Sequence, residues 1–429
     1  MIIGTKSPRG GSPPGSGAPS ERPAALGFVY VAILMNVLSM GIIIPVFPTL
    51  VKSLTGADDG HAAQITGVFG AAWALMQLIF APLFGALSDR FGRRPVLIVS
   101  MFGLALDYLI MALAPNIAWL FVGRVISGIT SASGSAAGAY VADVSTPQNR
   151  ARNFGRFMAA ANAGIVLGPA LGGFVGQVDP RAPFWVAAAL AFVNGLYGLF
   201  VVPESLSKER RAPFRWASAN AVGAVSLLAS KPGLLGLAGM IFLNQFAAMS
   251  FNSVFQFYTH YRFGWGPKDI GIFLMALGFG SIIVQSFLAG AAATRLGERG
   301  SVLTGLALGA AGFAVLGLAS QVAVFWAGAA ILIISGISGP SAQSMMTQRV
   351  EADEQGRLQG ALSIFLGATG LIGPVLFTNA FAWSIAGGKA WGLPGLSILI
   401  GSGLIVGALA MAWVFARPPP APQSLAAAP

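Results

Sequence analysis

Two charged side chains, Asp107 and Arg124, stand inside long apolar stretches of this sequence. Each lies seven residues from the end of its stretch, so both are expected ~10 Å below the same membrane surface. The short turn Pro115-Asn116 joins the two stretches and makes their helices neighbours. Burial favours the neutral form of an acid and a nearby arginine favours its anion, so Asp107 and Arg124 are candidates for proton exchange. A purely structural ion pair is the alternative.

Amide side chains interrupt several other apolar stretches. Asn36 and Gln77 would both lie about 20 Å below the outer ends of theirs, close to mid-membrane. Amides donate and accept hydrogen bonds, so they could bind a small molecule in a central cavity together with Asp107. The later stretches add Gln245, Asn252, Gln256 and Gln285. Each of these amides could instead bond a neighbouring helix.

The segment Gly85–Arg94, GALSDRFGRR, is a charged elbow between two apolar stretches. An acid among arginines can form charge-assisted bonds in one conformation and release them in another. The segment is therefore a candidate conformational gate, made of Gly85, Asp89, Arg90, Gly92, Arg93 and Arg94. The alternative is that the arginines only orient the chain in the membrane, which leaves Asp89 unexplained.

The elements that must position these residues are membrane-spanning helices. Apolar residues make up 55% of the chain and charged residues 9%, and the charges cluster between apolar runs of bilayer-spanning length. The sequence predicts an all-α membrane protein with twelve spans: 24–50, 64–87, 95–114, 117–141, 154–176, 184–202, 233–259, 270–293, 301–320, 322–346, 358–382 and 393–416.

The distribution of positive charge predicts the orientation in the membrane. Nineteen of the 25 Lys and Arg residues lie in the tails, the central loop and alternate loops. The positive-inside rule then makes both termini cytoplasmic in a multi-pass protein of the cell membrane, inner or plasma. The net charge of +11 follows from this topology, so no nucleic-acid partner is expected.

Cysteine and histidine chemistry is sparse. The chain contains no cysteine and two histidines, His61 and His260, near the outer ends of different spans. Two histidines in separate halves make no metal site. His260 is interpreted as a solvated loop histidine, and the alternative is a residue that titrates near neutral pH. Neither a metal nor a cofactor is expected.

A spacing of 205 residues recurs along the chain. It relates Gly85–Arg94 to Gly290–Arg299, Arg152 and Gly155 to Arg357 and Gly360, and Gly168-Pro169 to Gly373-Pro374. Such coincidences indicate an internal duplication and predict two pseudo-symmetric six-helix bundles. The predicted parts are a disordered cytoplasmic tail (1–23), the first bundle (24–202), a cytoplasmic linker (203–232), the second bundle (233–416) and a second tail (417–429).

The fifth span carries a dense glycine motif. Its members are Gly164, Gly168, Pro169, Gly172 and Gly173. Small residues at this spacing allow close helix approach in lipid, and a proline within a span frees a backbone carbonyl that neighbouring helices must satisfy.

Together these motifs resemble a known family. GALSDRFGRRPVL, GRVISGITSASGSAAGAYVAD and GPALGG resemble the major facilitator superfamily. LMQLIFAPLFGALSDRFGRRPVL, LDYLIMAL, YRFGW and QGRLQGAL are similar to its tetracycline/proton antiporter branch. The resemblance runs from about Leu26 to the end of the twelfth span, omitting the central loop.

The resemblance implies the twelve-helix fold of that family and a function as a secondary active exporter. A small amphiphilic compound, tetracycline-like, would leave in exchange for protons, by alternating access in a monomer. It also implies that Asp89 and its arginines latch the cytoplasmic side when the carrier faces outward. The glycine motif in the fifth span marks antiporters in this family.

Three positions depart from the branch. Ser281 aligns with an intramembrane histidine, and Gly309 and Asn36 align with intramembrane acids. These departures put the proton stoichiometry and a metal chelate as substrate in question. A proton-coupled importer of a sugar-like nutrient is the alternative function. An intramembrane enzyme or sensor is disfavoured because cysteine, intramembrane histidine and a nucleotide-binding loop are all lacking.

Overall fold

The computed structural model describes residues 23–131, 134–146, 148–207, 209, 211, 227–228, 230–231, 233–351, 354–386 and 393–416. Regular structure within these residues is helical throughout. The predicted tails, apart from residue 23, and most of the predicted linker lie outside the described residues. The proposed boundaries of the parts therefore stay predictions.

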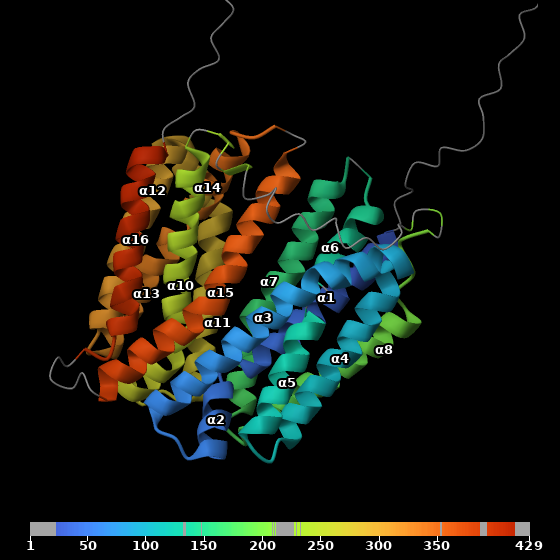
Figure 1. Cartoon of the computed structure of the whole chain (residues 1–429), viewed down its shortest axis with the longest axis horizontal. Helices are drawn as coiled ribbons and strands as arrows, with labels where there is room; N and C mark the ends of the chain where they lie inside the picture. The colour runs from blue at the N-terminus through green and yellow to red at the C-terminus, as the bar shows by residue number, and fades with distance from the viewer. Residues whose placement is uncertain are drawn as a thin grey trace, which may run out of the picture.

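The helices form two groups (Figure 1). The first group contains α1 (Pro23–Ile43), α2 (Phe47–Thr55), α3 (Asp59–Phe91), α4 (Arg93–Leu113), α5 (Ile117–Thr130), α6 (Gly134–Asp143), α7 (Arg150–Val175) and α8 (Ala182–Phe200). The second contains α10 (Leu234–Phe263), α11 (Pro267–Ile283), the π-helical turn η4 (Val284–Leu288), α12 (Ala289–Leu318), α13 (Val322–Ser335), α14 (Ser338–Thr347), α15 (Gln355–Ala386) and α16 (Leu396–Phe415).

The twelve predicted spans are recovered from these helices. Ten segments of the described chain are long and apolar enough to cross a membrane, and one of them, Pro267–Leu318, has 52 residues. Its backbone turns at Gly297, where φ is 71°, and this turn divides it into two spans. The shorter helices α5 and α6 follow one another and together supply the remaining span.

Local chemistry explains where helices begin and end. The side chain of Asp58 caps α3 by accepting a hydrogen bond from the His61 N–H at 2.8 Å. Such a cap lets the helix start before the predicted apolar stretch. Asn116 caps α5 in the same way, with the N–H groups of Ala118 and Trp119 at 3.1 and 3.2 Å. The sharp α3–α4 turn uses Gly92 at φ 110°, a conformation that favours glycine.

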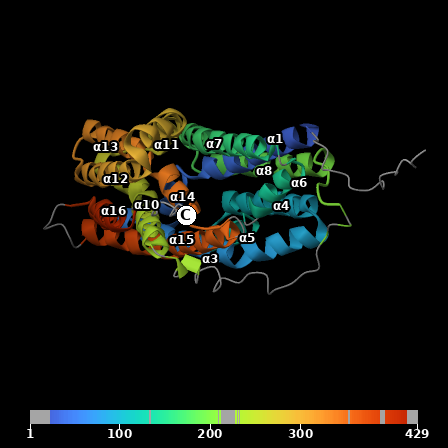
Figure 2. The same ribbon diagram turned by 90° about the horizontal axis from the view of Figure 1, so that it is seen from above.

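The same pairs of helices pack in each group. In the first, α1 packs on α7 and α8, and α4 packs on α8; in the second, α10 packs on α15 and α16, and α12 packs on α16. The groups meet along two seams, α3 with α15 and α7 with α11 (Figure 2). The 205-residue offset relates α3 to α11 and α7 to α15, so it maps each seam onto the other. The helix packing therefore has the predicted pseudo-symmetry.

The two Gly-Pro pairs occupy equivalent places. A Cβ added at Gly168 would lie 2.7 Å from the Cα of Gly41 on α1, and one at Gly373 would lie 2.7 Å from the Cβ of Met249 on α10. The carbonyls of the following prolines face glycines across the two seams, Gly271 on α11 and Gly67 on α3. The predicted duplication is therefore visible in the structure.

We call the face where α1 begins and α16 ends the terminal face, and the opposite face the distal face. The two groups converge at the distal face and diverge toward the terminal face (Figure 1). Contacts along α3–α15 run from Gly60 at the distal end to Leu78, which meets Gly367 in mid-helix. Gln64 donates a hydrogen bond to Asn379 across the same seam at 2.9 Å.

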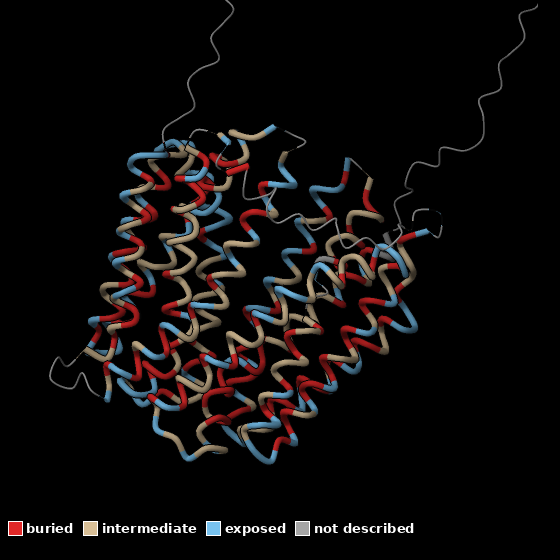
Figure 3. The backbone as a smooth tube through the Cα atoms, viewed as in Figure 1, coloured by how far each residue is buried: buried red, intermediate tan, exposed pale blue. Residues whose placement is uncertain are grey.

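Burial follows this arrangement. Buried positions occur throughout both groups and where they meet, and many large apolar residues are exposed (Figure 3). Exposed apolar faces of this extent suit a protein surrounded by lipid rather than water.

Candidate functional site

A cavity of about 360 Å³ lies between the two groups of helices, directly behind the distal contacts. Its walls come from α1, α2, α3, α4, α5, α10 and α15. The polar residues that line it are Thr66, Tyr108, Arg124, Ser127, Asn252, Ser253, Gln256 and Thr378. Among the described residues that line it, only Arg124 is charged.

Helical spacing places the lining residues of each helix on one face of that helix. Thr66, Gly70 and Trp73 follow one face of α3, and Met249, Asn252 and Gln256 follow one face of α10. The predicted positions of Asn252 and Gln256 at a central cavity agree with the structure. Whether they bind a substrate stays a prediction.

Arg124 is held by aromatic rings at the cavity wall. Its guanidinium lies 5.0 Å from the ring centre of Phe47 and 6.0 Å from that of Trp73. Both distances are within the range of cation–π attraction. These two rings could not be predicted as partners of Arg124, because nothing in the spacing of Phe47 and Trp73 distinguishes them from other apolar residues of the chain.

Three buried polar atoms without partners belong to residues that line this cavity. In the described part of the chain, no hydrogen-bond partner is present for Nε of Arg124, the hydroxyl of Thr66 or Oε1 of Gln256. Such groups are uncommon in folded proteins. All three residues line the cavity, but these particular atoms are buried within its wall rather than exposed to it.

Asp107 lies behind this wall. Its side chain is fully buried, and Arg124, Tyr108 and Ser127 are its polar neighbours. α5 approaches closely here because it has glycine at position 123, where a Cβ would lie 3.1 Å from Oδ1 of Asp107. The structure thus brings Asp107 and Arg124 together, as the turn predicts. Of these two charged residues only Arg124 lines the cavity, so a direct contact of Asp107 with substrate is not supported in this conformation.

The other predicted amides are placed differently. Gln77 and Gln245 lie about one turn from Ala74 and Met249, on the same helix faces but nearer the terminal face. Asn36 lines a separate cavity of about 30 Å³ inside the first group, because α1 passes beside α4 and α6 at that level. This corrects the expectation that Asn36 lines the central cavity.

Gln285 is also away from the central cavity. It lies in the π-helical turn η4 and is exposed. The extra residue of a π-helical turn shifts the register of the helix, and periodicity alone does not reveal it. The expectation that Gln285 faces the same cavity is therefore corrected as well.

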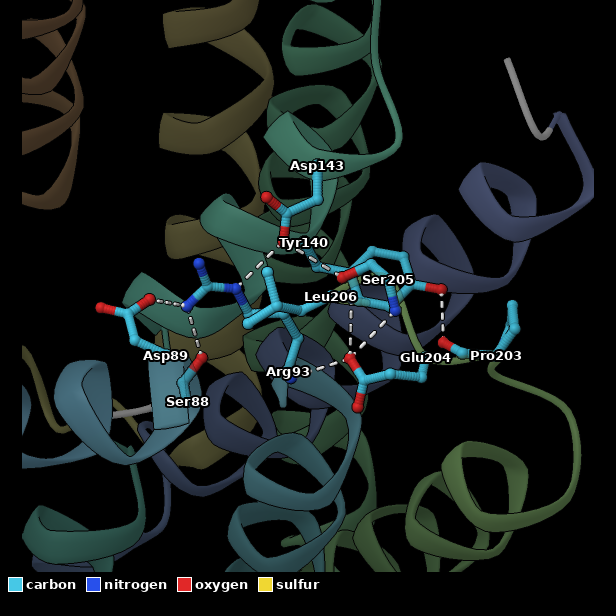
Figure 4. A network of polar contacts seen from close by, with 9 residues as sticks. All are labelled: Ser88, Asp89, Arg93, Tyr140, Asp143, Pro203, Glu204, Ser205 and Leu206. Carbon is cyan, nitrogen blue, oxygen red and sulfur yellow. Dashed lines mark hydrogen bonds and ion pairs between the residues drawn. The ribbon is translucent and has the colours of Figure 1, made fainter. Parts of the chain in front are cut away.

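The elbow is organised around Arg93 rather than Asp89 (Figure 4). The guanidinium of Arg93 donates to Ser88 Oγ at 2.8 Å, to Asp143 Oδ2 at 3.1 Å, and to Asp89. Its side chain is 11% exposed, against 52% for Asp89. All of these partners belong to the first group, so the elbow is self-contained in this conformation.

A second acid completes the elbow. Glu204 Oε1 accepts the backbone N–H of Arg93 at 2.9 Å and those of Ser205 and Leu206 at 3.0 and 3.1 Å. A Cβ at Gly92 would overlap the other oxygen of Glu204, so glycine is needed there for this contact as well as for its backbone angle. Glu204 could not be predicted as part of the elbow, because it lies 111 positions from Arg93 along the chain.

The remaining elbow residues have separate roles. Arg94 donates to the carbonyls of Gly198 and Leu199 at the end of α8. Arg90 is exposed and its guanidinium lies 5.1 Å from the ring centre of Phe91, while Gly85 is half-buried on α3. Their function in gating is untested and stays a prediction.

The glycine motif of α7 packs on two helices. Gly164, Gly168 and Gly172 face α1, and a Cβ at Gly172 would overlap the carbonyl oxygen of Ile42. Gly173 faces α11 across the seam, and the carbonyl of Pro169 lies against Gly271. The motif therefore joins α7 both to its own group and to the other one.

The family model described as Major Facilitator Superfamily matches residues 29–374 and 237–429. The chain therefore belongs to the major facilitator superfamily, a class of membrane transporters built on this fold. The predictions of family, fold and transporter class are confirmed.

Within this class the chain is similar to tetracycline resistance proteins. It is 35% identical to the class C protein of Escherichia coli over 383 residues, which cover 89% of this chain and 94% of that protein. It is 35% identical to the class B protein of Escherichia coli over 364 residues, covering 84% and 89%.

A solved structure supports the fold. The bacterial homologue of the human lysosomal transporter Spinster, in an inward-facing and unoccupied conformation, superposes with a TM-score of 0.70 at 16% identity. The match covers 93% of this chain and 98% of that one.

Proposed function

We propose that this chain is a secondary active exporter that moves a small, tetracycline-like amphiphile out of the cell in exchange for protons. Its relatives at 35% identity are tetracycline resistance proteins. The observation that carries the proposal is the central cavity, which lies between two pseudo-symmetric groups and has a single charged lining residue, Arg124, with Asp107 buried behind it.

The geometry suits alternating access. The two groups meet at the distal face and diverge toward the terminal face, and rocking about the α3–α15 and α7–α11 seams would exchange the closed side. The concentration of Lys and Arg supports a cytoplasmic terminal face. In this conformation the carrier would accept its substrate from the cytoplasm.

The cavity wall suits a planar amphiphile with hydrogen-bond acceptors. The cavity volume of about 360 Å³ is within the range of small-molecule sites. Phe47 and Trp73 offer flat apolar contacts, while Arg124 and Thr66 can donate hydrogen bonds. Because the described lining residues include no acid, the proposed substrate is the metal-free compound rather than a cationic metal chelate.

Asp107 is the proposed proton carrier. It would take up a proton while the distal side is open and release it while the terminal side is open, with Arg124 stabilising the anion between these steps. The cavity lies within one chain, so the proposed active unit is the monomer. The elbow around Arg93 would act as the cytoplasmic gate.

The proposal is tested by expressing the chain in a host that lacks its own efflux systems. Resistance to tetracycline-like compounds should rise and be lost when a protonophore collapses the proton gradient. Everted membrane vesicles should accumulate the compound with or without added divalent metal. Greater accumulation of the compound in intact expressing cells would contradict export and favour import.

A further inference from the structure

Three titratable side chains join the two groups of helices at the distal face. Nζ of Lys52 on α2 lies 2.7 Å from Oδ1 of Asp59 on α3 and 2.9 Å from Nε2 of His260 on α10. Nε2 of His260 is 3.8 Å from the same oxygen of Asp59. We call Lys52, Asp59 and His260 the distal cluster.

The fold brings these residues together from distant parts of the chain. α2 ends at Thr55 and α3 begins at Asp59, so Lys52 and Asp59 lie on either side of one short turn of the first group. His260 is in the last turn of α10, which ends where Gly264 adopts φ 68°. Of the two bonds in which Lys52 takes part, the bond to His260 is the one that crosses between the groups.

The hydrogen bond between Lys52 and His260 requires a neutral imidazole. An ammonium group has only donors, so Nε2 must accept with its lone pair. A proton on Nε2 removes that acceptor and leaves two cations in contact. Lys52 at 2.9 Å is nearer to Nε2 than Asp59 at 3.8 Å. Because Coulomb energy falls inversely with distance, repulsion by the lysine exceeds attraction by the carboxylate by a factor of about 1.3.

Few charged groups surround His260 among the residues that the structure describes. On α3, Asp58 and His61 accompany Asp59 at the helix start, where Asp58 is engaged in capping. On α10 itself, Arg262 donates to the carbonyl of Ala319 and Tyr261 lines the distal mouth. The helices α14 and α16 contain no titratable residue, and the one in α15, Arg357, is at its opposite end.

The distal cluster is open to the surrounding medium. The side chain of His260 is 45% exposed, so a proton can reach it without passing through the protein. Histidine is the side chain whose charge ordinarily changes between about pH 5 and 8. The neighbouring bond between Gln64 and Asn379 also crosses the seam but has no group that titrates.

We propose that His260 is a proton-binding residue of the transport cycle that releases the distal closure. A proton from the distal medium binds Nε2, breaks the hydrogen bond with Lys52 and favours separation of the two groups at that face. This step rests on the alternating-access part of the proposed function and adds a second proton-responsive site to Asp107. It would couple an acidic exterior to the outward-open conformation.

The test measures the width of the distal face by pulsed electron paramagnetic resonance. The chain has no cysteine, so Ser53→Cys on α2 and Ala386→Cys on α15, both exposed, accept two spin labels without other changes. The labelled chain is studied in lipid nanodiscs without substrate from about pH 5 to 8. The population with the long distance should rise several-fold as the pH falls.

Matched variants assign the response to one histidine. His260→Gln keeps a neutral acceptor at every pH and should hold the short distance throughout. His61→Gln removes the other histidine and should leave the response unchanged. His260→Lys introduces a permanent cation and should give the long distance at every pH, whereas Lys52→Met should weaken the response.

Two results would overturn the proposal. One is a pH response that survives in His260→Gln or disappears in His61→Gln. The other is a distance that shortens as the pH falls, which would mean that protonated His260 binds Asp59 and tightens the closure. Because no substrate is present, either result is independent of whether the chain exports a tetracycline-like compound.

Discussion

The helix hairpins α4–α5 and α12–α13 are equivalent elements of the two groups and pack in the same way. Gly123 of α5 packs on Met111, and Gly328 of α13 packs on Leu316, at the 205-residue offset in both members. A Cβ at either glycine would lie 2.6 or 3.0 Å from the facing side chain. The helices of both hairpins therefore approach through the same small residue.

The two hairpins differ in charge. Asp107 and Arg124 of the first correspond to Gly312 and Ala329 of the second, both of which are buried. The second hairpin thus forms the same fold without any charge at these positions. Since burying two charged side chains costs desolvation that apolar packing does not, the comparison disfavours a purely structural role for Asp107 and Arg124. It supports the proposed function in transport.

The largest expected effect on export comes from giving the first hairpin the residues that the second has at the two charged positions. The double substitution Asp107→Gly with Arg124→Ala should abolish proton-driven export, because both charges are removed. Insertion and thermal stability should stay close to those of the unchanged chain, because the second hairpin folds with these residues. Vesicle transport and thermal unfolding of the purified protein measure the two quantities. Loss of the folded protein would restore the structural interpretation.

The equivalent helices α7 and α15 also differ in how they pack within their groups. Gly172 of α7 corresponds to Phe377 of α15, whose ring centre lies 5.2 Å from that of Phe246. A methyl group at Gly172 would overlap the backbone of Ile42, where no side chain can give way. The first group therefore depends on backbone contact where the second uses aromatic packing.

Gly172→Ala should destabilise the fold by about 1–3 kcal/mol, because it overpacks the α1–α7 contact. Gly155→Ala is the control in the same helix, since nothing lies within 4 Å of a Cβ there. Thermal unfolding in detergent should show a clear fall in Tm for the first variant and none for the second. Equal values for the two would contradict the geometry at Gly172.

The elbows extend the comparison to the terminal face. The ion pair of Arg93 with Asp143 corresponds to the hydrogen bond of Gln348 with Glu298, 3.0 Å long. Arg94 donates to a backbone carbonyl at the end of α8, and Arg299 donates to one at the end of α16. The backbone contacts are shared, but the extra acid Asp89 has the neutral counterpart Thr294.

Asp89→Asn should lower export about tenfold while expression stays normal, because the side chain is exposed and its known partner is Arg93. Thr294→Val, the matched change in the second elbow, should leave export nearly unchanged. Initial rates in everted vesicles, normalised to the amount of inserted protein, decide between them. Normal export by Asp89→Asn would remove the gate assigned to this elbow.

The smallest effect concerns the turns that precede α7 and α15. Asn149 accepts the N–H of Thr146 at 2.9 Å, and Glu354 accepts that of Glu351 at 3.1 Å, again at the same offset. The hydrogen bond from Lys231, followed by that from the Glu351 backbone, holds the pKa of Glu354 below its ordinary value. At these two turns the charged residue is Glu354 of the second group, whereas its counterpart Asn149 in the first group is neutral.

A lowered pKa means that Glu354 stabilises the fold above the pKa of its unfolded form and loses this effect as the pH falls through its folded value. Glu354→Gln should therefore cause a small fall in Tm near neutral pH that disappears below about pH 4. The effect is small because water screens a charge at the surface. A fall in Tm that grows in acid would contradict the sign.

Much of this could be predicted from the sequence, because it depends on local pattern. Apolar runs predicted the spans, and the turn at Pro115-Asn116 predicted that Asp107 and Arg124 are neighbours. Helical spacing was sufficient to predict that Asn252 and Gln256 lie at the central cavity. It failed for Asn36, whose face of α1 meets other helices of its own group at that level.

Other parts of the site depend on contacts between distant segments. Glu204 meets Arg93 across 111 positions, and Lys52 meets His260 across 208. Neither pair has a spacing that one sequence can reveal, since it is set by how α8 returns and how the groups close. His260 is partly exposed, as the sequence suggested, but it lies in the last turn of α10 and is bonded to Lys52 rather than free in a loop.

Proton exchange through Asp107 can be measured as proton movement in proteoliposomes. The purified chain is reconstituted with a pH-sensitive dye inside, and a gradient of the tetracycline-like compound is imposed. The unchanged chain should move protons against the compound, and Asp107→Asn, which cannot release a proton, should move none while remaining folded. Unchanged proton movement in Asp107→Asn would show that protons are exchanged elsewhere and would contradict the account.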